Sequence, residues 1–169
     1  MQRNECEGCT MCCKVYRIAE LEKPRGKWCD HCETDVGCKQ YADRPKTCST
    51  FECVWLQGRL RDDPAWSPDA LRPDRCRVVV AASGDGNDFV ATPDPGTPAA
   101  WRKADVLVWL HRLAAASRLA GGTGMVGVDT EPYAYVVTAG GAVMRAKAKS
   151  PVQADGSRQI TGLVREGVV

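Results

Sequence analysis

Cysteines crowd the beginning of this chain far more densely than packing requires. Four of them lie within eight residues, in the segment CEGCTMCC at residues 6–13, and all ten occur by Cys76. A thiolate is a soft ligand that selects zinc, copper(I) or iron–sulfur clusters. The sequence therefore predicts that the N-terminal part of the chain holds a metal through sulfur.

The redox compartment decides what ten cysteines mean. Residues 1–5 lead straight into the cysteines and lack the apolar core of a secretory signal. No apolar run approaches the roughly 20 residues that a membrane-spanning helix needs. We therefore expect a cytoplasmic protein outside the membrane. Thiols stay reduced in the cytosol, which favours metal binding over structural disulfides or a purely redox role.

Charge and composition narrow the range of partners. The 23 basic and 21 acidic residues leave a net charge of +2, which gives no general attraction to nucleic acid or anionic membranes. Apolar residues at 44% and charged residues at 26% are typical of a folded globular protein. We expect no membrane partner, the charge balance does not favour a nucleic-acid partner, and the cysteine-rich part is where a protein partner would dock.

The cysteine content also predicts how the chain is divided. No cysteine follows position 76. The sequence predicts a cysteine-rich metal-binding module over residues 1–76, a small α+β domain over 77–139, and a weakly structured tail or extra hairpin over 140–169. The first part is poor in aliphatic residues, so we expect metal to supply much of its stability.

Hydrophobic patterns predict an α+β fold, with an irregular cysteine-rich module followed by a β-β-α-β-β layer. Residues 15–22 are expected to extend a short helix that begins within the cysteine cluster. Such a helix would place Cys6, Cys9 and Cys13 near one face. Four strands are expected over 76–82, 88–92, 125–128 and 133–138, with a turn over 83–87 and weaker strand signals at 142–146 and 159–164.

The one long helix is expected between the second and third of those four strands. Thr97 and Pro98 have the character of an N-cap and a first helical residue, and two glycines after residue 120 mark the end. The predicted apolar stripe consists of Trp101, Ala104, Leu107, Val108, Leu110 and Ala114.

The spacing of the first cysteines indicates a metal cluster. Cys6, Cys9 and Cys12 follow one another at two-residue intervals, as in the local half of a bacterial ferredoxin-type motif, which a remote cysteine completes. Cys13 directly follows Cys12, and adjacent side chains splay apart. The adjacent pair therefore fits two neighbouring metals or one polynuclear cluster better than a single ion.

A second group of cysteines follows, at residues 29, 32, 38, 48 and 53. Cys29 and Cys32 have the spacing of a zinc knuckle. Zinc and iron–sulfur clusters both select thiolate, so ligand type leaves either Zn²⁺ or a [4Fe–4S] cluster open. The first triad and the adjacent pair slightly favour iron–sulfur. The candidate ligands are Cys6, Cys9, Cys12, Cys13, Cys29, Cys32, Cys38 and Cys48, with Cys53 as a further candidate.

These motifs resemble a known family. The C-x2-C-x2-CC segment at residues 6–13, followed by G-C-x2-Y-x2-R-P-x2-C-x2-F at residues 37–51, is similar to the YkgJ-like cysteine-cluster family, whose domain is described as zinc- or iron-chelating. The resemblance covers about residues 4–56. It implies metal binding but no particular activity. The shared ligands that it implies are Cys6, Cys9, Cys12, Cys13, Cys38 and Cys48, with Cys29 or Cys32 in the remaining middle position.

The same resemblance sets two limits. Cys53 and Cys76 are not among the shared ligands that the resemblance implies. A related cysteine cluster accompanies flagellin lysine methylases, but this chain lacks the length and the motif for a methyl-donor site.

Tyr41 and Arg44 are candidates for residues that surround the ligands. Four thiolates around a divalent ion leave a net negative charge, which a nearby guanidinium offsets. Arg44 could also donate hydrogen bonds to sulfur, an interaction that tunes metal sites.

The chain shows no acid–base pair or activated nucleophile, which favours a role without catalysis. A structural, carrier or accessory metal protein is the preferred interpretation. An electron-transfer or redox-sensing iron–sulfur protein is the second, and a zinc-stabilised module that docks on an enzyme or nucleic acid is the third.

Overall fold

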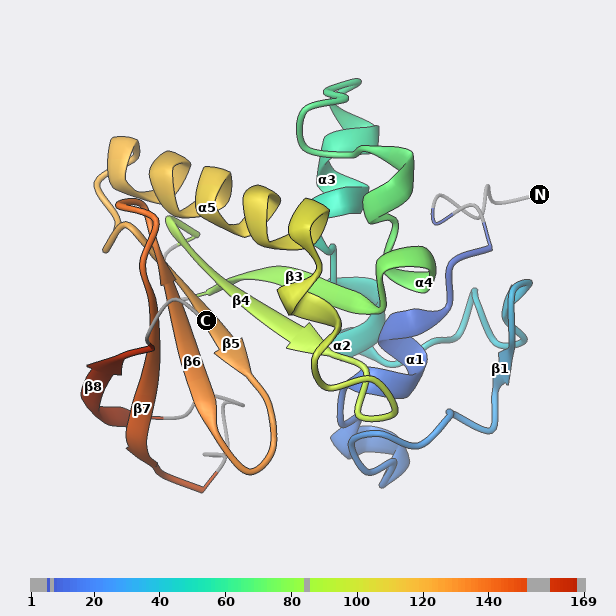
Figure 1. The fold of residues 1–169 in the computed structure, drawn as a ribbon. Coiled ribbons are helices and arrows are strands. Elements are labelled where there is room, and N and C mark those ends of the chain that lie inside the picture. Colours follow the sequence, from blue (N-terminus) through green and yellow to red (C-terminus); the bar gives the residue numbers. More distant parts are fainter. Residues whose placement is uncertain (1–5, 7, 84–85, 152–158, 167–169) are drawn as a thin grey trace. The chain divides into compact units, whose positions relative to one another are not determined.

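The computed structural model describes residues 6, 8–83, 86–151 and 159–166 (Figure 1). Residues 1–5, on which the expected compartment depended, lie outside these ranges. The chain forms two compact units, one comprising Met1–Ala81 with Pro93–Ala100 and the other Ala82–Thr92 with Trp101–Val169. All ten cysteines belong to the first unit. Helices and strands both occur, which confirms the predicted α+β class.

The first unit is built from short elements, as expected for a segment with few aliphatic residues. Two strands form a small sheet, and the remaining elements are helical segments of three to seven residues. They are α1 (Met11–Val15), η1 (Ala19–Leu21), β1 (Cys32–Glu33), β2 (Gly37–Cys38), α2 (Lys46–Ser49), α3 (Val54–Leu60), η2 (Asp69–Leu71) and α4 (Pro73–Cys76).

The first helix differs from its prediction. It begins at Met11 and ends at Val15, because Tyr16 takes an extended conformation with φ −89° and ψ 152°. Cys6 and Cys9 therefore precede the helix, and the expectation that they share a helical face with Cys13 is wrong.

A small apolar cluster anchors α1. Met11 and Val15, at i and i+4, are 1% and 0% exposed and pack with Val79. The half-buried side chains of Cys9 and Cys53 pack against the same cluster. The apolar face of the helix thus packs into the core. Cys12 and Cys13 follow Met11 in the helix and are only half-buried.

The second unit contains most of a six-stranded sheet, whose order is β3-β4-β5-β6-β7-β8. β4 and β5 are parallel, and the pairs from β5 to β8 are antiparallel. The elements are β3 (Val78–Ser83), β4 (Asp88–Pro93), η3 (Ala100–Arg102), α5 (Ala104–Leu119), β5 (Met125–Asp129), β6 (Ala134–Thr138), β7 (Val143–Lys149) and β8 (Ile160–Arg165).

The expected β-β-α-β-β order is confirmed. Parallel strands need a crossover connection, and α5 supplies it between β4 and β5. The helix lies across the sheet against β5 and β6 (Figure 1). The two weak strand signals after residue 140 correspond to β7 and β8. Part of the turn predicted over 83–87 lies outside the described residues, although the Gly86 N–H donates to the Ser83 carbonyl at 3.1 Å.

The long helix starts later than predicted. Thr97 lies in a turn in which its carbonyl accepts from the Ala100 N–H at 2.9 Å, and α5 begins only at Ala104. This shifts the apolar stripe. Val108, expected in the stripe, is 51% exposed, and Ala104 is exposed too. The buried positions of α5 are Val106, Trp109, Leu110, Leu113, Ala114 and Ser117.

One fully buried carboxylate ties the 93–100 segment to the rest of the first unit. Asp94 is 0% exposed and pairs with Lys14 Nζ at 2.8 Å and with the Arg77 guanidinium. It also accepts from the Gly96 N–H at 3.1 Å. Burial alone would raise the pKa of Asp94, but the Lys14 and Gly96 hydrogen bonds and the Arg77 charge lower it. Within the described ranges, no helix is long and apolar enough to cross a membrane.

Asp94→Asn should lower the free energy of unfolding by about 3 kcal/mol, because it leaves Lys14 and Arg77 without their shared buried carboxylate. Urea unfolding, with hydrogen exchange at the Gly96 and Thr97 amides, would measure the loss. Glu131→Gln is the matched control, since its side chain is 61% exposed in its pair with Lys149 and should cost at most about 1 kcal/mol. Equal losses in the two variants would contradict the proposed importance of Asp94.

The same carboxylate predicts an acid-sensitive contribution to stability. Its folded pKa lies below the unfolded value of about 3.9. The stabilisation is therefore fully present above that unfolded value and is lost as the pH falls through the folded pKa. Urea midpoints measured from pH 6 down to pH 2 should fall more steeply for the wild type than for Asp94→Asn. Parallel curves for the two proteins would contradict this.

Candidate functional site

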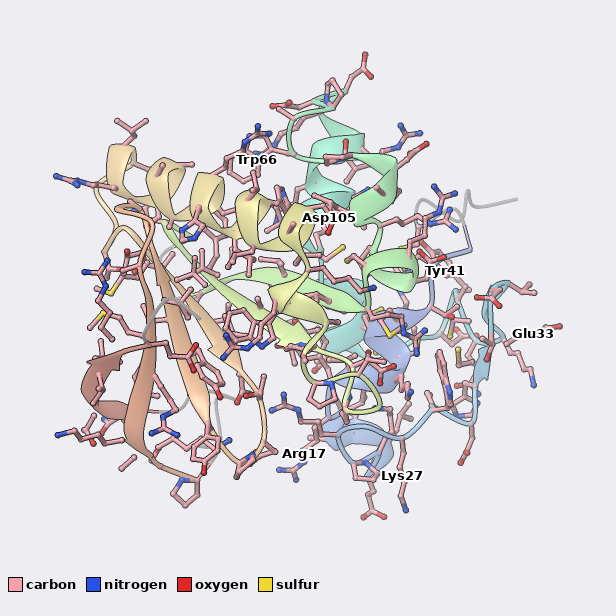
Figure 2. The ribbon with its side chains drawn as sticks, viewed as in Figure 1. Arg17, Lys27, Glu33, Tyr41, Trp66 and Asp105 are labelled. Carbon is pink, nitrogen blue, oxygen red and sulfur yellow. The ribbon has the colours of Figure 1, made fainter. Side chains whose placement is uncertain are left out.

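Nine of the ten cysteines line one cavity of about 300 Å³ within the first unit. In Figure 2, yellow sulfur atoms gather around α1 and α4. The cavity brings together all eight candidate ligands and the further candidate. The nine are Cys6, Cys9, Cys12, Cys13, Cys29, Cys32, Cys38, Cys48 and Cys53.

The tenth cysteine has a different environment. Cys76 is 3% exposed and does not line the cavity. Its thiol lies 3.4 Å from the Leu71 carbonyl and 3.3 Å from the Val78 carbonyl, which serve as acceptors. Cys76 is therefore part of the packing of α4, and it provides a natural reference for the other nine.

Tight backbone turns bring cysteines three residues apart to the same side of the chain. The Cys9 N–H donates to the Cys6 carbonyl at 2.8 Å, and the Cys32 N–H donates to the Cys29 carbonyl at 2.9 Å. Two of the three C-x2-C segments thus close in the same way. The spacing that suggested metal ligands in the sequence corresponds to a real local turn at these two places.

Longer-range contacts bring these turns together. The Cys29 N–H donates to the Cys13 carbonyl at 3.1 Å, which joins the middle cysteines to α1. Cys32 lies directly opposite Cys38 in the antiparallel pair of β1 and β2. The turn between these strands passes through Asp35, whose φ of 62° is left-handed.

A carboxylate clip places the Cys48 segment. Glu20 Oε1 accepts from the Thr47 hydroxyl at 2.6 Å and from the Thr47 N–H at 3.2 Å. These hydrogen bonds lower the pKa of Glu20. The clip connects η1 to α2 across 27 residues, so the helix that carries Cys48 is held next to the segment that follows α1.

Burial and crowding oppose ionisation of the thiols. A hydrogen bond with the neighbouring Cys12 thiol and then burial raise the pKa of Cys13. Burial and the nearby Cys13 raise the pKa of Cys32 to about 12. Burial, followed by Cys13 and Cys29, raises the pKa of Cys48 to about 11. These groups would become thiolates only with positive charge inside the cavity.

A buried lysine that is not among the cavity-lining residues supplies a positive charge close to these thiols, and sequence reasoning missed it. Lys23 is 6% exposed, and its ammonium donates to the carbonyls of Lys14 at 3.2 Å, Pro24 at 3.0 Å and Tyr16. Burial lowers the pKa of Lys23, whereas the thiols of Cys29 and Cys13 act to raise it. No local pattern marks Lys23, because its partners are backbone carbonyls that any residue could provide.

Tyr41 and Arg44 both line the cavity, as the predicted role requires (Figure 2 labels Tyr41). The Arg44 guanidinium carbon lies 3.9 Å from the centre of the Tyr41 ring, a cation–π arrangement. Both side chains are half-buried. The hydrogen bonds from Arg44 to metal-bound sulfur stay a prediction.

The cavity gathers the sulfur atoms without presenting a finished ligand set. Among the described residues, no three Cys, His, Asp or Glu side chains converge closely enough to hold a metal ion. No disulfide links the ten cysteines, all of which the structure describes. A cysteine side chain moves its sulfur by one χ1 rotation between staggered rotamers. Metal binding here would therefore require changes of side-chain rotamer around a backbone that already brings the cysteines together.

Comparison of the chain with models of protein families, with curated proteins and with solved structures gives no match. The cavity and the sequence motifs are therefore the features of the chain that bear on its function.

Lys23→Met should lower the free energy of unfolding by roughly 1–3 kcal/mol, because it removes the donor from three carbonyls in a buried place. Urea unfolding of the purified protein measures this loss. Lys27→Met is the matched control, since Lys27 lies four residues away and is exposed. A Lys23 variant as stable as the Lys27 variant would show that the ammonium contributes nothing to the fold.

Proposed function

We propose that this protein binds metal through cysteine thiolates and that its first unit is a metal-stabilised module. The observation that carries the proposal is the single cavity lined by nine cysteines. Six of the nine come in pairs from three short turns or helices, and the other three come from separate segments. Nearness in the sequence therefore does not explain why all nine line one cavity. Thiols in such numbers, with no disulfide among them, suit soft metals.

The dimensions of the cavity favour more than one metal atom. Its volume of about 300 Å³ is many times the roughly 10–15 Å³ that a single water molecule needs. A tetrahedral zinc ion sits about 2.3 Å from each sulfur and leaves no such space between its ligands. A polynuclear iron–sulfur cluster, or two separate centres, fits better, and we favour iron–sulfur over zinc.

The proposed ligands are drawn from the eight cysteines that the motif spacing, the zinc-knuckle pair and the resemblance to the YkgJ-like family together indicate. The eight are Cys6, Cys9, Cys12, Cys13, Cys29, Cys32, Cys38 and Cys48. When bound, the metal supplies the positive charge that the thiols lack and links segments that share few apolar contacts. Lys23 reduces the remaining negative charge, because its ammonium interacts with the nearby thiols of Cys29 and Cys13. The proposed role is structural or as a carrier in the cytoplasm.

Anaerobic purification followed by metal and sulfide analysis tests this function. We expect bound iron together with acid-labile sulfide. Zinc without sulfide would replace the iron–sulfur assignment but keep thiolate metal binding. A folded protein that takes up neither metal, even after reconstitution with iron and sulfide or with Zn²⁺, would remove the proposal.

Cys13→Ser should reduce the bound metal and loosen the segments that carry Cys29, Cys32 and Cys48, because structural metal binding and folding are coupled. Hydrogen exchange of the amides of Cys29, Cys32 and Cys48, together with metal analysis, measures both effects. Cys76→Ser is the matched control: its hydroxyl can keep the carbonyl acceptors of Leu71 and Val78, and it lies outside the cavity lining. Full metal content in Cys13→Ser would show that Cys13 is not a ligand.

A further inference from the structure

We propose that the cavity holds two metal centres and that Cys53 belongs to the one formed by Cys6 and Cys9, apart from a second centre around Cys13, Cys29 and Cys48. This inference rests on the proposed thiolate function and assigns ligands within it. The resemblance to a known family gives no role to Cys53, which lies beyond the matched ligands.

Cys53 is held in place by elements far from the first cysteines in sequence. It is the N-cap of α3, where its Sγ accepts from the Leu56 N–H at 3.4 Å. Its backbone also forms an isolated antiparallel bridge with Ala81, next to the strand segment that carries Val79. The sulfur is therefore fixed at the base of a helix and beside the core of the first unit.

Cys9 reaches the same place from the other side. Its half-buried side chain packs, like that of Cys53, against the cluster of Met11, Val15 and Val79. The Cys6–Cys9 turn holds Cys6 next to Cys9, because the Cys9 N–H donates to the Cys6 carbonyl at 2.8 Å. Cys9 and Cys53 thus meet at one apolar cluster, and Cys6 is joined to Cys9 by a backbone turn.

Backbone donors at the Cys53 group suit bound sulfur. The Leu56 N–H points at Cys53, and the N–H groups of Met11 and Asp74 favour the thiolate of Cys9 against the effect of burial. Hydrogen bonds to metal-bound sulfur orient the ligands and tune the metal. Such donors are already in position without any change of backbone.

We assign Cys12 as the fourth ligand of the Cys53 group, since four is the number that a structural zinc ion or a [4Fe–4S] cluster takes. This assignment requires a change of rotamer that breaks the hydrogen bond between the Cys12 and Cys13 thiols. Cys12 follows Cys9 by three residues, so the chain segment and a remote cysteine together make the C-x2-C-x2-C plus one arrangement. Cys13 is left to the second centre, with Cys29, Cys48 and one of the opposed pair Cys32 and Cys38. Each thiol releases its proton to solvent as it binds.

Metal content of serine variants tests the division. Cys53→Ser retains a capping oxygen for α3, since serine is a preferred N-cap, but replaces the soft ligand. We expect Cys53→Ser and Cys48→Ser each to keep about half of the wild-type metal and the double variant to keep almost none. Cys76→Ser, outside the cavity lining, should keep it all.

The possible outcomes distinguish a failure of the proposed metal-binding function from a failure of the two-centre assignment. A wild type without thiolate-bound metal overturns the proposed function. A metal-loaded wild type with a Cys53→Ser variant of full metal content overturns only the role of Cys53. A double variant that loses no more metal than either folded single variant would mean one centre rather than two.

Alkylation of the wild type decides the matter if the variants do not fold. The metal-loaded protein is treated with increasing chelator, and the cysteines that become reactive to iodoacetamide are identified by mass spectrometry. We expect Cys53 to become reactive together with Cys6 and Cys9, in a step distinct from that of Cys29 and Cys48. Exposure of all five in one step, or of Cys53 before any metal leaves, overturns the inference.

Discussion

Crowding of sulfur in a half-buried space is the constraint on which the first unit depends. Nine thiols face one cavity, and burial together with their neighbours holds the pKa of Cys32 near 12 and that of Cys48 near 11. Neutral thiols are weak hydrogen-bond partners and contribute little cohesion. Ionised thiols would repel one another. The arrangement therefore becomes strongly cohesive only when positive charge enters among the sulfurs, which is the physical reason to assign metal to it.

The two lysines near the cysteine cluster have different partners and different roles. Lys14 is next to Cys13 in sequence, but its charge is taken up by the buried carboxylate of Asp94, at 2.8 Å. Lys23 has neutral partners at its ammonium, three backbone carbonyls, so its charge remains directed at the thiols. One lysine thus fastens the 93–100 segment to α1, while the other offsets negative charge at the cavity. The protein supplies only part of the charge that nine sulfurs need.

Local spacing made the cavity predictable in part. Two of the three C-x2-C segments form the turns that their spacing indicates, because a turn of three residues needs no distant partner. The contacts of Lys23 and the position of Cys53 beside Cys9 depend on residues far away in the chain, and no pattern encodes them. Similarly, the order of strands and helix was readable from apolar runs, whereas the start of α5 was displaced by a turn and a 3₁₀ segment that lack a sequence signature.

The adjacent pair on α1 gives the two proposed centres a mechanical connection. Cys12 and Cys13 are bonded neighbours on a five-residue helix whose position is fixed by Met11 and Val15 in the core. A change of rotamer at one cysteine is felt by the other, since their thiols already share a hydrogen bond that raises the pKa of Cys13. Ligation of Cys12 removes that hydrogen bond and the obstacle that it poses to ionisation of Cys13. Filling the first centre should therefore make Cys13 easier to ionise at the second, while each centre still takes up and releases its metal in a step of its own.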